Sequence, residues 1–192
     1  MISETLKKIV PTCPYKLITL YAPFIDAAMK EFDINTPLRQ AAFIAQVAHE
    51  TMGLNKLNEL WGPTPQQLKY DTSIRLMNQL GNKQLGDGFK YRGRGGLHIT
   101  GLGNYTKYGK ALGVDLVNHP ELAESQVFAF RIAGLFWKDH GLNELADKLV
   151  NDPEYKNFEQ ITSKINGSYT APTSHYPERL AYLKKAKEVL HA

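Results

Sequence analysis

Cysteine, long apolar runs and metal-ligand spacing are what this sequence has least of. Its 192 residues include one cysteine, Cys13, which excludes an internal disulfide and is typical of synthesis in a reducing cytosol. No run of eighteen apolar residues occurs, so no membrane-spanning helix is expected. Six histidines are spread between residues 49 and 191, and His49-Glu50 lacks the second histidine of the H-E-x-x-H zinc motif. We therefore expect no metal site.

The sequence also has only a small excess of one charge sign over the other. The chain carries 23 Lys and Arg against 19 Asp and Glu, a net charge of +4, and this mild basicity would assist approach to a polyanion. No zinc-finger spacing, arginine-rich arm or recognition-helix signature occurs, so a nucleic-acid partner is not expected. Near the N-terminus, Lys16 and three prolines interrupt any apolar signal core, which indicates mature structure and synthesis in the cytoplasm.

Helical periodicity dominates what is present. The apolar spacing predicts helices over 15–33, 36–52, about 65–80, 102–112, 120–140, 143–150, 157–165 and 176–190. The helix ending near Met52 is apolar almost all round, so we expect it to be central and buried. Gly, Pro, Asn and Asp recur over 53–98, which predicts a loop-rich lobe. The fold class is therefore mainly α, in a single domain spanning 1–192.

The stretch "YRGRGGLHIT" at 91–100 invites comparison with a phosphate-binding loop. It lacks the Lys-Ser/Thr of a P-loop, and His98 occupies the last glycine position of G-x-G-x-x-G. A nucleotide is therefore not expected, and no cofactor is predicted. The glycines have two interpretations. They allow either a tight turn packed under the helices or close approach of backbone to a ligand.

Two glutamates nine positions apart, Glu50 and Glu59, fit a glycoside hydrolase. Such enzymes use one protonated carboxyl group and one ionised carboxylate. Burial at the end of an apolar helix favours the protonated form of Glu50, and a polar turn favours the ionised form of Glu59. Glutamates on helices are more often surface residues in weak ion pairs. The pattern alone leaves a two-carboxylate hydrolase and a structural or binding domain both open.

Several blocks together carry a family resemblance that runs from about residue 15 to 190. They are "RQAAFIAQVAHETMG", "NELWGPTPQQLKY", "GDGFKYRGRGGLHITGLGNYTKYG", "PELAE", "GLFWKDHGLNELAD" and "ITSKINGSY". The sequence resembles phage-type endolysins of glycoside hydrolase family 19, which are relatives of plant chitinases. The resemblance implies a lysozyme-like α domain in which the 53–98 lobe flanks a substrate cleft.

The resemblance also implies catalytic roles. Glu50, after Ala-His, matches the general acid, and Glu59, before W-G-P-T, matches the proposed base. Thr100, which closes the Gly-rich motif, matches a hydroxyl residue that holds the attacking water. Asn166, in the I-N-G motif, is similar to a residue that lines the sugar cleft.

Further sugar contacts are predicted with looser matches. Asn104 and Arg179 lie in segments that resemble the family's cleft, and the aromatic rings of Trp61 and Tyr91 could stack on sugar faces, although core packing explains Trp61 equally well. His98 stands where the family usually has Gln.

The implied function is cleavage of the β-1,4 glycan backbone of bacterial peptidoglycan, leading to lysis of a host cell. The region between the glutamates and the Gly-rich motif is short compared with plant chitinases, which implies an open cleft suited to a peptide-crosslinked glycan. A chitinase and a catalytically silent envelope-binding domain remain alternatives. We expect a monomer without a separate cell-wall-binding domain or stable membrane insertion. It would be synthesised in the host cytoplasm, act in the periplasm or cell wall, and depend on a separate permeabilising protein for access.

The stereochemistry can also be predicted. In one continuous helix, nine residues would separate two α-carbons by about 13.5 Å and place them on opposite faces. Gly53 ends the helix first, so Glu59 can fold back to face Glu50 across a cleft. Carboxylates on separate segments favour the wide spacing, about 6.5–9.5 Å, at which a water fits between them. We therefore expect inversion, which is also the outcome that the family implies.

Overall fold

The computed structural model describes residues 3–167 and 175–192, and within them the regular structure is helical, with isolated β-bridges only. The helices are α1 (Ser3–Ile9), α2 (Tyr15–Glu31), α3 (Pro37–Glu50), α4 (Pro65–Thr72), α5 (Ile74–Leu80), α6 (Asp87–Lys90), α7 (Leu102–Leu112), η1 (Pro120–Glu124), α8 (Gln126–Asp139), α9 (Leu142–Asp147), η2 (Lys148–Asn151), α10 (Lys156–Asn166) and α12 (Tyr176–Leu190). The predicted mainly α class is confirmed. No described helix is long and apolar enough to span a bilayer.

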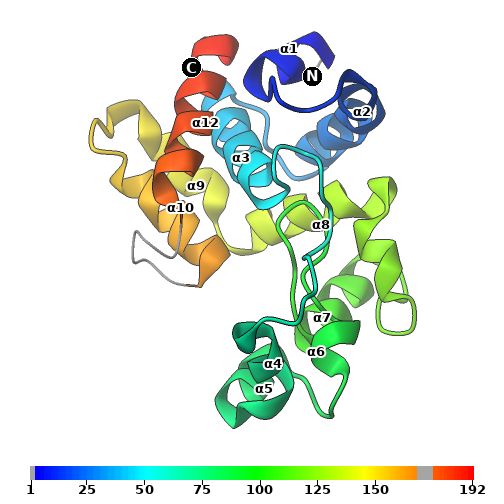
Figure 1. The fold of residues 1–192 in the computed structure, drawn as a ribbon. Helices are drawn as coiled ribbons and strands as arrows, with labels where there is room; N and C mark the ends of the chain where they lie inside the picture. Colours follow the sequence, from blue (N-terminus) through cyan, green and yellow to red (C-terminus); the bar gives the residue numbers. More distant parts are fainter. Residues whose placement is uncertain (1–2, 168–174) are drawn as a thin grey trace.

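Helix α3 lies at the centre of the larger lobe (Figure 1). Every residue of its 41–48 segment is buried, as the all-round apolar pattern predicts. Helix α12 packs along α3, and α2 packs on α8. The central position of α3 matters for function because its last residue is Glu50.

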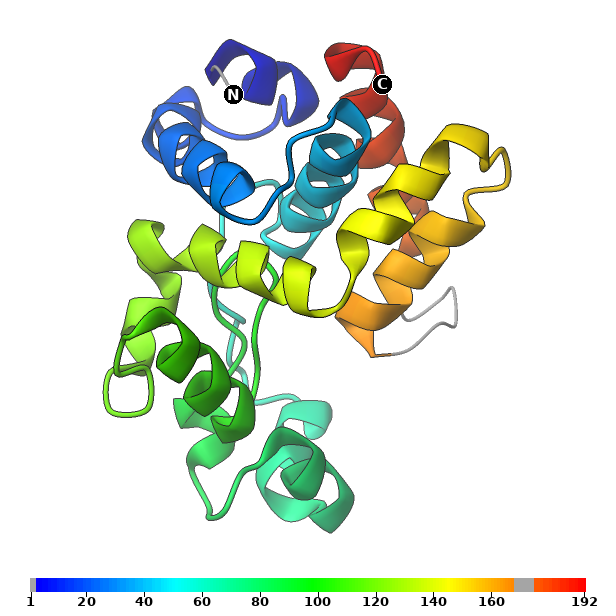
Figure 2. The ribbon, with the colours of Figure 1, turned by 180° about the vertical axis from the view of Figure 1, so that it is seen from behind.

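The smaller lobe contains α4, α5, α6 and α7, and α8 crosses the molecule between the two lobes (Figure 2). A second, smaller apolar cluster lies here, separate from the main core, and it includes the buried rings of Tyr91, Tyr105 and Tyr108. Helices α4 and α5 contact each other, and α4 also contacts α6 while α5 contacts α7. The lobe therefore has its own packing.

The predicted helices agree with the structure except at several boundaries. The predicted 65–80 helix is two helices, which meet at Ser73. The predicted 120–140 helix divides at Ser125, whose hydroxyl accepts a hydrogen bond from the Phe128 amide and caps α8. Pro23 lies inside an uninterrupted α2. The 53–98 region is less irregular than predicted, because it holds three short helices.

Candidate active site

The chain turns sharply after Glu50. Met52, Gly53 and Leu54 all have positive φ angles, from 52° to 72°, a conformation that ends a helix. Thr51 stabilises the turn from inside the core, because its hydroxyl donates to the Val47 carbonyl at 2.6 Å and accepts from the Leu54 amide at 2.9 Å. The turn leaves Glu50 partly buried at the end of a buried helix and sends the chain back toward Glu59.

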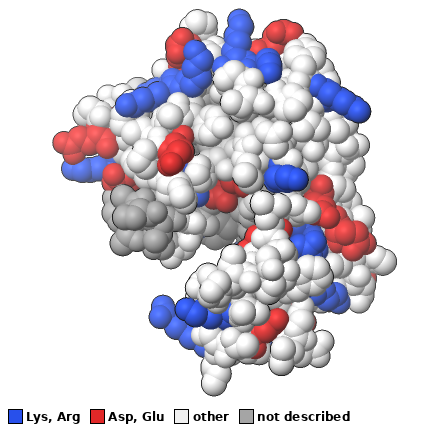
Figure 3. Space-filling view, in the orientation of Figure 1, with Lys and Arg blue, Asp and Glu red and all other residues white. Residues whose placement is uncertain are grey.

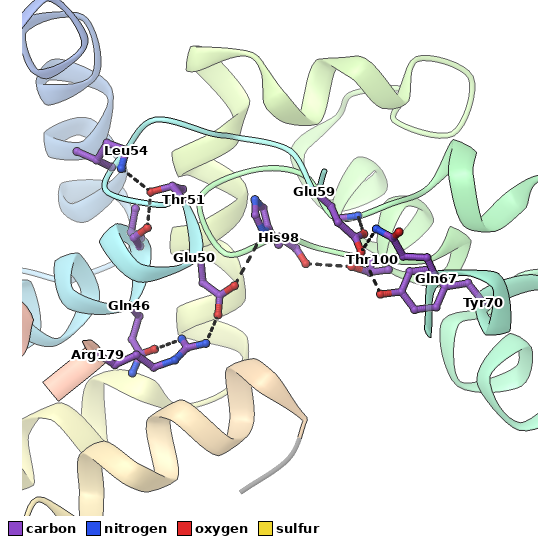
Figure 4. A network of polar contacts seen from close by, with 12 residues as sticks. Gln46, Glu50, Thr51, Leu54, Glu59, Gln67, Tyr70, His98, Thr100 and Arg179 are labelled. Atoms are coloured by element: carbon purple, nitrogen blue, oxygen red, sulfur yellow. Dashed lines mark hydrogen bonds and ion pairs between the residues drawn. The ribbon is translucent and has the colours of Figure 1, made fainter. Parts of the chain in front are cut away.

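A polar network holds the Glu50 carboxylate in place (Figure 4). Arg179, from α12, donates from Nη2 to Glu50 Oε1 at 2.5 Å and from Nη1 to Gln46 Oε1 at 2.5 Å. Gln46 in turn donates to the Thr162 hydroxyl at 2.8 Å. Gln46, Thr162 and Arg179 are almost fully buried. Three helices therefore fix one oxygen of the Glu50 carboxyl group, Oε1, through a charge-assisted hydrogen bond from Arg179.

Glu59 is positioned by a short strand-like pairing with the Gly-rich segment. The Glu59 amide donates to the Gly93 carbonyl at 2.7 Å, and the Gly95 amide donates to the Leu57 carbonyl at 2.8 Å. Isolated bridges join Asn58 to Arg94 and Arg94 to Ile99. The Gly-rich segment is thus a hairpin that presents Glu59 from its neighbouring strand.

Neutral donors surround the Glu59 carboxylate. The Gly93 amide donates to Oε2 at 3.0 Å, and Gln67 Nε2 donates to Oε1 at 2.8 Å. The Tyr70 hydroxyl approaches Oε1 at 3.4 Å. Hydrogen bonds from neutral groups stabilise a carboxylate without a balancing charge, which suits an ionised base.

The glycines of the hairpin have two different roles. A Cβ at Gly93 would lie 3.3 Å from the Thr100 hydroxyl and 3.4 Å from Glu59 Cβ, beside the cavity. At Gly95, φ is +89°, and a Cβ would lie 3.2 Å from the carbonyl oxygens of Ala123 and Ala129. Gly96 is equally close to α8. The ligand-approach interpretation fits Gly93, whereas Gly95 and Gly96 serve packing.

One open cavity of about 350 Å³ joins these elements. The residues that line it are Glu50, Glu59, Tyr70, Gly93, Leu97, His98, Thr100, Ile165 and Asn166. A hollow with acidic side chains in it is visible between the two lobes (Figure 3). Of the predicted site residues, Glu50, Glu59, Thr100, His98 and Asn166 meet here. The two carboxylates come from different segments, and the His98–Thr100 stretch lies between them (Figure 4).

His98 and Thr100 face this cavity from the second arm of the hairpin. His98 has a positive φ of 49°, and its Nδ1 lies 3.9 Å from Glu50 Oε2. Burial lowers the pKa of His98, against the opposing effect of the two glutamates. The Thr100 hydroxyl lies 3.2 Å from the His98 carbonyl. A neutral imidazole and a hydroxyl group are therefore available between the carboxylates.

The pKa values of two neighbouring side chains are strongly shifted. Burial, followed by the charge of Arg179, lowers the pKa of His49 to about 4. Burial, followed by the charge of Glu59 and the hydrogen bond to it, raises the pKa of Tyr70 to about 12. His49 is therefore neutral at pH 7, and Tyr70 keeps its proton as a donor.

Two aromatic predictions are corrected. Tyr91 is 3% exposed and packs in the second apolar cluster, with its hydroxyl donating to the Val117 carbonyl at 3.2 Å. It cannot stack on a sugar in this cavity. Trp61 packs edge-on against Phe89 at 5.3 Å and does not line the cavity. Trp61 is only partly buried and lies outside both apolar clusters, beside the exposed ring of Phe89, so the core packing that was its alternative interpretation is not found either.

Two polar predictions are corrected as well. Arg179 is 2% exposed and bonds to Glu50, so it holds a carboxylate rather than a sugar. Asn104 donates to the Thr100 carbonyl at 2.9 Å and does not line the cavity, so it positions the segment that carries Thr100.

Three residues that hold the two carboxylates were not predicted from the sequence: Gln46, Gln67 and Tyr70. Gln67 had a readable signal, because T-x-x-Q before a helix predicts a capping box. Gln46 lies one turn before Glu50, and its burial inside an apolar helix demanded a partner. Tyr70 gave no signal that distinguishes it from a packing residue.

Comparisons with known proteins agree with this site. The model of the chitinase class I family matches residues 7–144. A glycosyl hydrolase family 19 domain-containing protein of Haemophilus influenzae is 31% identical over 191 residues, which cover 87% of this chain and 88% of that protein. A basic endochitinase of Vitis vinifera is 36% identical over 145 residues, which cover 66% of this chain and 44% of that enzyme. The chain therefore spans less than half of the plant protein's length.

Solved structures show the same fold. A bacterial family 19 chitinase superimposes with a TM-score of 0.68 at 22% identity, covering 98% of this chain and 94% of that one. A class IV chitinase from Zea mays has a TM-score of 0.62 at 24% identity, covering 88% and 79%. The predicted lysozyme-like α domain is thus confirmed. Since the family model matches more than half of the chain, this protein belongs to glycoside hydrolase family 19, whose enzymes act on β-1,4 bonds.

Proposed function

We propose that this chain is an endolysin that hydrolyses the β-1,4 glycan backbone of bacterial peptidoglycan with inversion. The observation that carries the mechanism is that Glu50 and Glu59 line one open cavity from separate segments, with different partners. Two carboxylates in unlike environments are what acid-base hydrolysis requires.

In this mechanism Glu50 is the acid. Its Oε1 is held by Arg179, so the proton that passes to the glycosidic oxygen is carried by Oε2. The bond between C1 and that oxygen breaks as the proton arrives. The leaving sugar departs with a new hydroxyl group, and Glu50 is left ionised beside the Arg179 guanidinium.

Glu59 is the base. It takes a proton from a water that attacks C1 from the opposite face of the sugar, and no glycosyl-enzyme intermediate forms. The Thr100 hydroxyl shares this water with Glu59, since both line the cavity. His98 and Asn166, from opposite lobes, contact the sugar on either side of the cleaved bond.

The choice of peptidoglycan rests on the openness of the site. Among the described residues that line the cavity, Tyr70 is the single Phe, Tyr or Trp, and most of the others are polar or small. Few aromatic platforms and a short connection between Glu59 and the hairpin leave room for a glycan that carries peptide branches. Synthesis in a host cytoplasm and release by a permeabilising protein belong to the same proposal.

Chitin is the second candidate substrate, because the plant relatives and solved neighbours are named as chitinases. Both polymers offer β-1,4-linked N-acetylated sugars, so the same two carboxylates serve either reaction. What separates them is tolerance of the lactyl-peptide branch.

The test is digestion of purified sacculi and of colloidal chitin, followed by borohydride reduction and mass spectrometry. Muramitol or glucosaminitol from sacculi supports peptidoglycan hydrolysis and identifies the bond that is cut. Anhydro-muramic products would indicate a lytic transglycosylase, and release from chitin alone would overturn the peptidoglycan assignment. Glu50→Gln should be inactive on both polymers, whereas Glu121→Gln, an exposed control outside the cavity, should be fully active.

A further inference from the structure

Gln67 occupies an unusual position at the start of α4. Thr64 caps this helix by accepting from the Gln67 amide at 3.2 Å, and Gln67 Oε1 accepts from the Thr64 amide at 2.7 Å, which completes a capping box. Such a box needs only an acceptor at this position, and Glu serves as well as Gln. Gln67 is nevertheless 4% exposed, because its other end faces Glu59.

The second half of the Gln67 amide is also fully used. Nε2 donates to Glu59 Oε1 at 2.8 Å and to the Leu60 carbonyl at 2.7 Å. The opposite amide orientation would set NH₂ against a backbone N–H and a carbonyl oxygen against a carboxylate. The network therefore fixes the orientation of the amide, and no other common side chain of this length both accepts and donates here.

We propose that Gln67 is a positioning residue for the catalytic base, which links the N-terminus of α4 to the orientation and ionised form of Glu59. This inference rests on the proposed role of Glu59. The neutral donor at 2.8 Å occupies one lone pair of Oε1 and so fixes the orientation of the carboxylate. It also stabilises the negative charge without placing a cation beside it. The backbone amide of Thr64 holds that donor in place, since it donates at 2.7 Å to Oε1 of the same side-chain amide.

The discriminating variant is Gln67→Glu. It preserves the capping acceptor and the side-chain length, so α4 should form normally. It also replaces a donor beside Glu59 with a second carboxylate, and two adjacent carboxylates resist simultaneous ionisation. We expect the acid limb of the kcat–pH profile on a soluble oligosaccharide to move to higher pH by about one unit or more, with little change in KM.

Thr64→Ala is the matched control. It removes the cap at a typical cost of about 1 kcal/mol but leaves the amide of Gln67 beside Glu59. We expect a lower Tm and an unmoved acid limb. Gln67→Met, which is uncharged and of similar length, is the second variant in case Gln67→Glu does not fold. It should move the limb in the same direction by a smaller amount.

The outcomes separate this inference from the proposed function. If Glu59→Gln is inactive and Gln67→Glu moves the acid limb while Thr64→Ala does not, the positioning role is supported. If Glu59→Gln is inactive and neither Gln67 variant moves the limb, Gln67 is only a cap and the inference is overturned. If Glu59→Gln keeps full activity, the assignment of the base itself fails.

Discussion

The two carboxylates of the cleft are held in opposite ways. On the larger lobe, Glu50 ends a buried helix and pairs with a buried cation, Arg179, which lies 129 positions away in the sequence. On the smaller lobe, Glu59 lies on a strand-like segment and receives hydrogen bonds from neutral donors, two of which are side chains within eleven residues of it. One carboxylate is fixed by tertiary packing and charge, and the other by local turns and amides.

This difference teaches why the two lobes need different kinds of structure. A cation can be buried beside Glu50 because Gln46 of α3 accepts a second hydrogen bond from Arg179 and is itself bonded to Thr162 of α10. A base that must accept a proton from water works better among neutral donors than beside a cation. A cation would stabilise the ionised carboxylate strongly and so weaken it as a base. The small lobe supplies such donors from a backbone amide and a capping side chain, without a large core.

The largest expected effect is a loss of folding stability when Arg179, the charged partner of Glu50, is removed. Arg179→Met leaves the Glu50 carboxylate and the Gln46 carbonyl oxygen without their shared donor. Breaking a buried ion pair in this way costs about 3–5 kcal/mol. Urea unfolding should show this loss of stability. The unfolding free energy of Arg179→Lys should lie between those of Arg179→Met and the wild type, because one ammonium group cannot replace the forked guanidinium.

A surface pair provides the control for Arg179. Arg131 donates from Nε and Nη2 to Glu31, but both side chains are more than one third exposed. Arg131→Met should cost about 1 kcal/mol or less. Equal losses from the two variants would show that Arg179 does not hold a buried charge.

A medium effect is expected from the imidazole between the two carboxylates. Burial lowers the pKa of His98, so the folded protein binds a proton there less readily than the unfolded chain does. The contribution of the neutral His98 side chain to folding stability is therefore fully present above the ordinary histidine pKa of about 6.5. It is lost as the pH falls toward the lowered pKa of His98 in the folded protein. His98→Gln should reduce the fall in Tm between pH 7 and pH 5 by a few degrees.

The control for the His98 effect is a histidine outside the cleft. His119 is more than half exposed, and His119→Gln should leave the pH dependence of Tm unchanged. An unchanged pH slope in the His98 variant would mean that its imidazole is not held in the neutral form. His49, with a pKa of about 4, continues the loss of stability to lower pH in both proteins.

The smallest effect is expected from Tyr70. Its hydroxyl is 3.4 Å from Glu59 Oε1, longer than a strong O–H···O bond. Tyr70→Phe should lower kcat by about tenfold or less, because a single ordinary hydrogen bond contributes about 0.5–1.5 kcal/mol. Steady-state assays on a soluble oligosaccharide measure this, with Tyr15→Phe, an exposed tyrosine on the other lobe, as control. A hundredfold loss of kcat would make Tyr70 a principal hydrogen-bond donor to the base and would contradict the view that Gln67 matters more than Tyr70.

Local signals in the sequence predicted most of the helices. The helix ending at Glu50 and the one over 102–112 follow from apolar spacing, caps and a following glycine. The division at Ser125 was missed although serine is a favoured N-cap, because the apolar pattern continues through it. The pair of helices over 65–80 was missed for a similar reason, since nothing but Ser73 separates them.

The site was predictable only in part, because local sequence does not report burial. Glu50 and Glu59 were predicted from their local pattern and from the family resemblance, whereas Thr100 was predicted from the resemblance alone. Tyr91 was mistaken for a sugar contact because an aromatic residue in a loop-rich segment looks the same whether it faces a cleft or a second core. The contact of Arg179 with Glu50 depends on the packing of α12 along α3, which no local pattern specifies.

The most direct test of the account is the configuration of the newly formed anomeric centre. Proton NMR of a soluble β-1,4-linked oligosaccharide, recorded before mutarotation, distinguishes the two mechanisms. If Glu50 is the acid and Glu59 activates water directly, the first product is the α-anomer. An initial β-anomer would mean retention through a covalent intermediate, and it would contradict the assignment of Glu59 as the base.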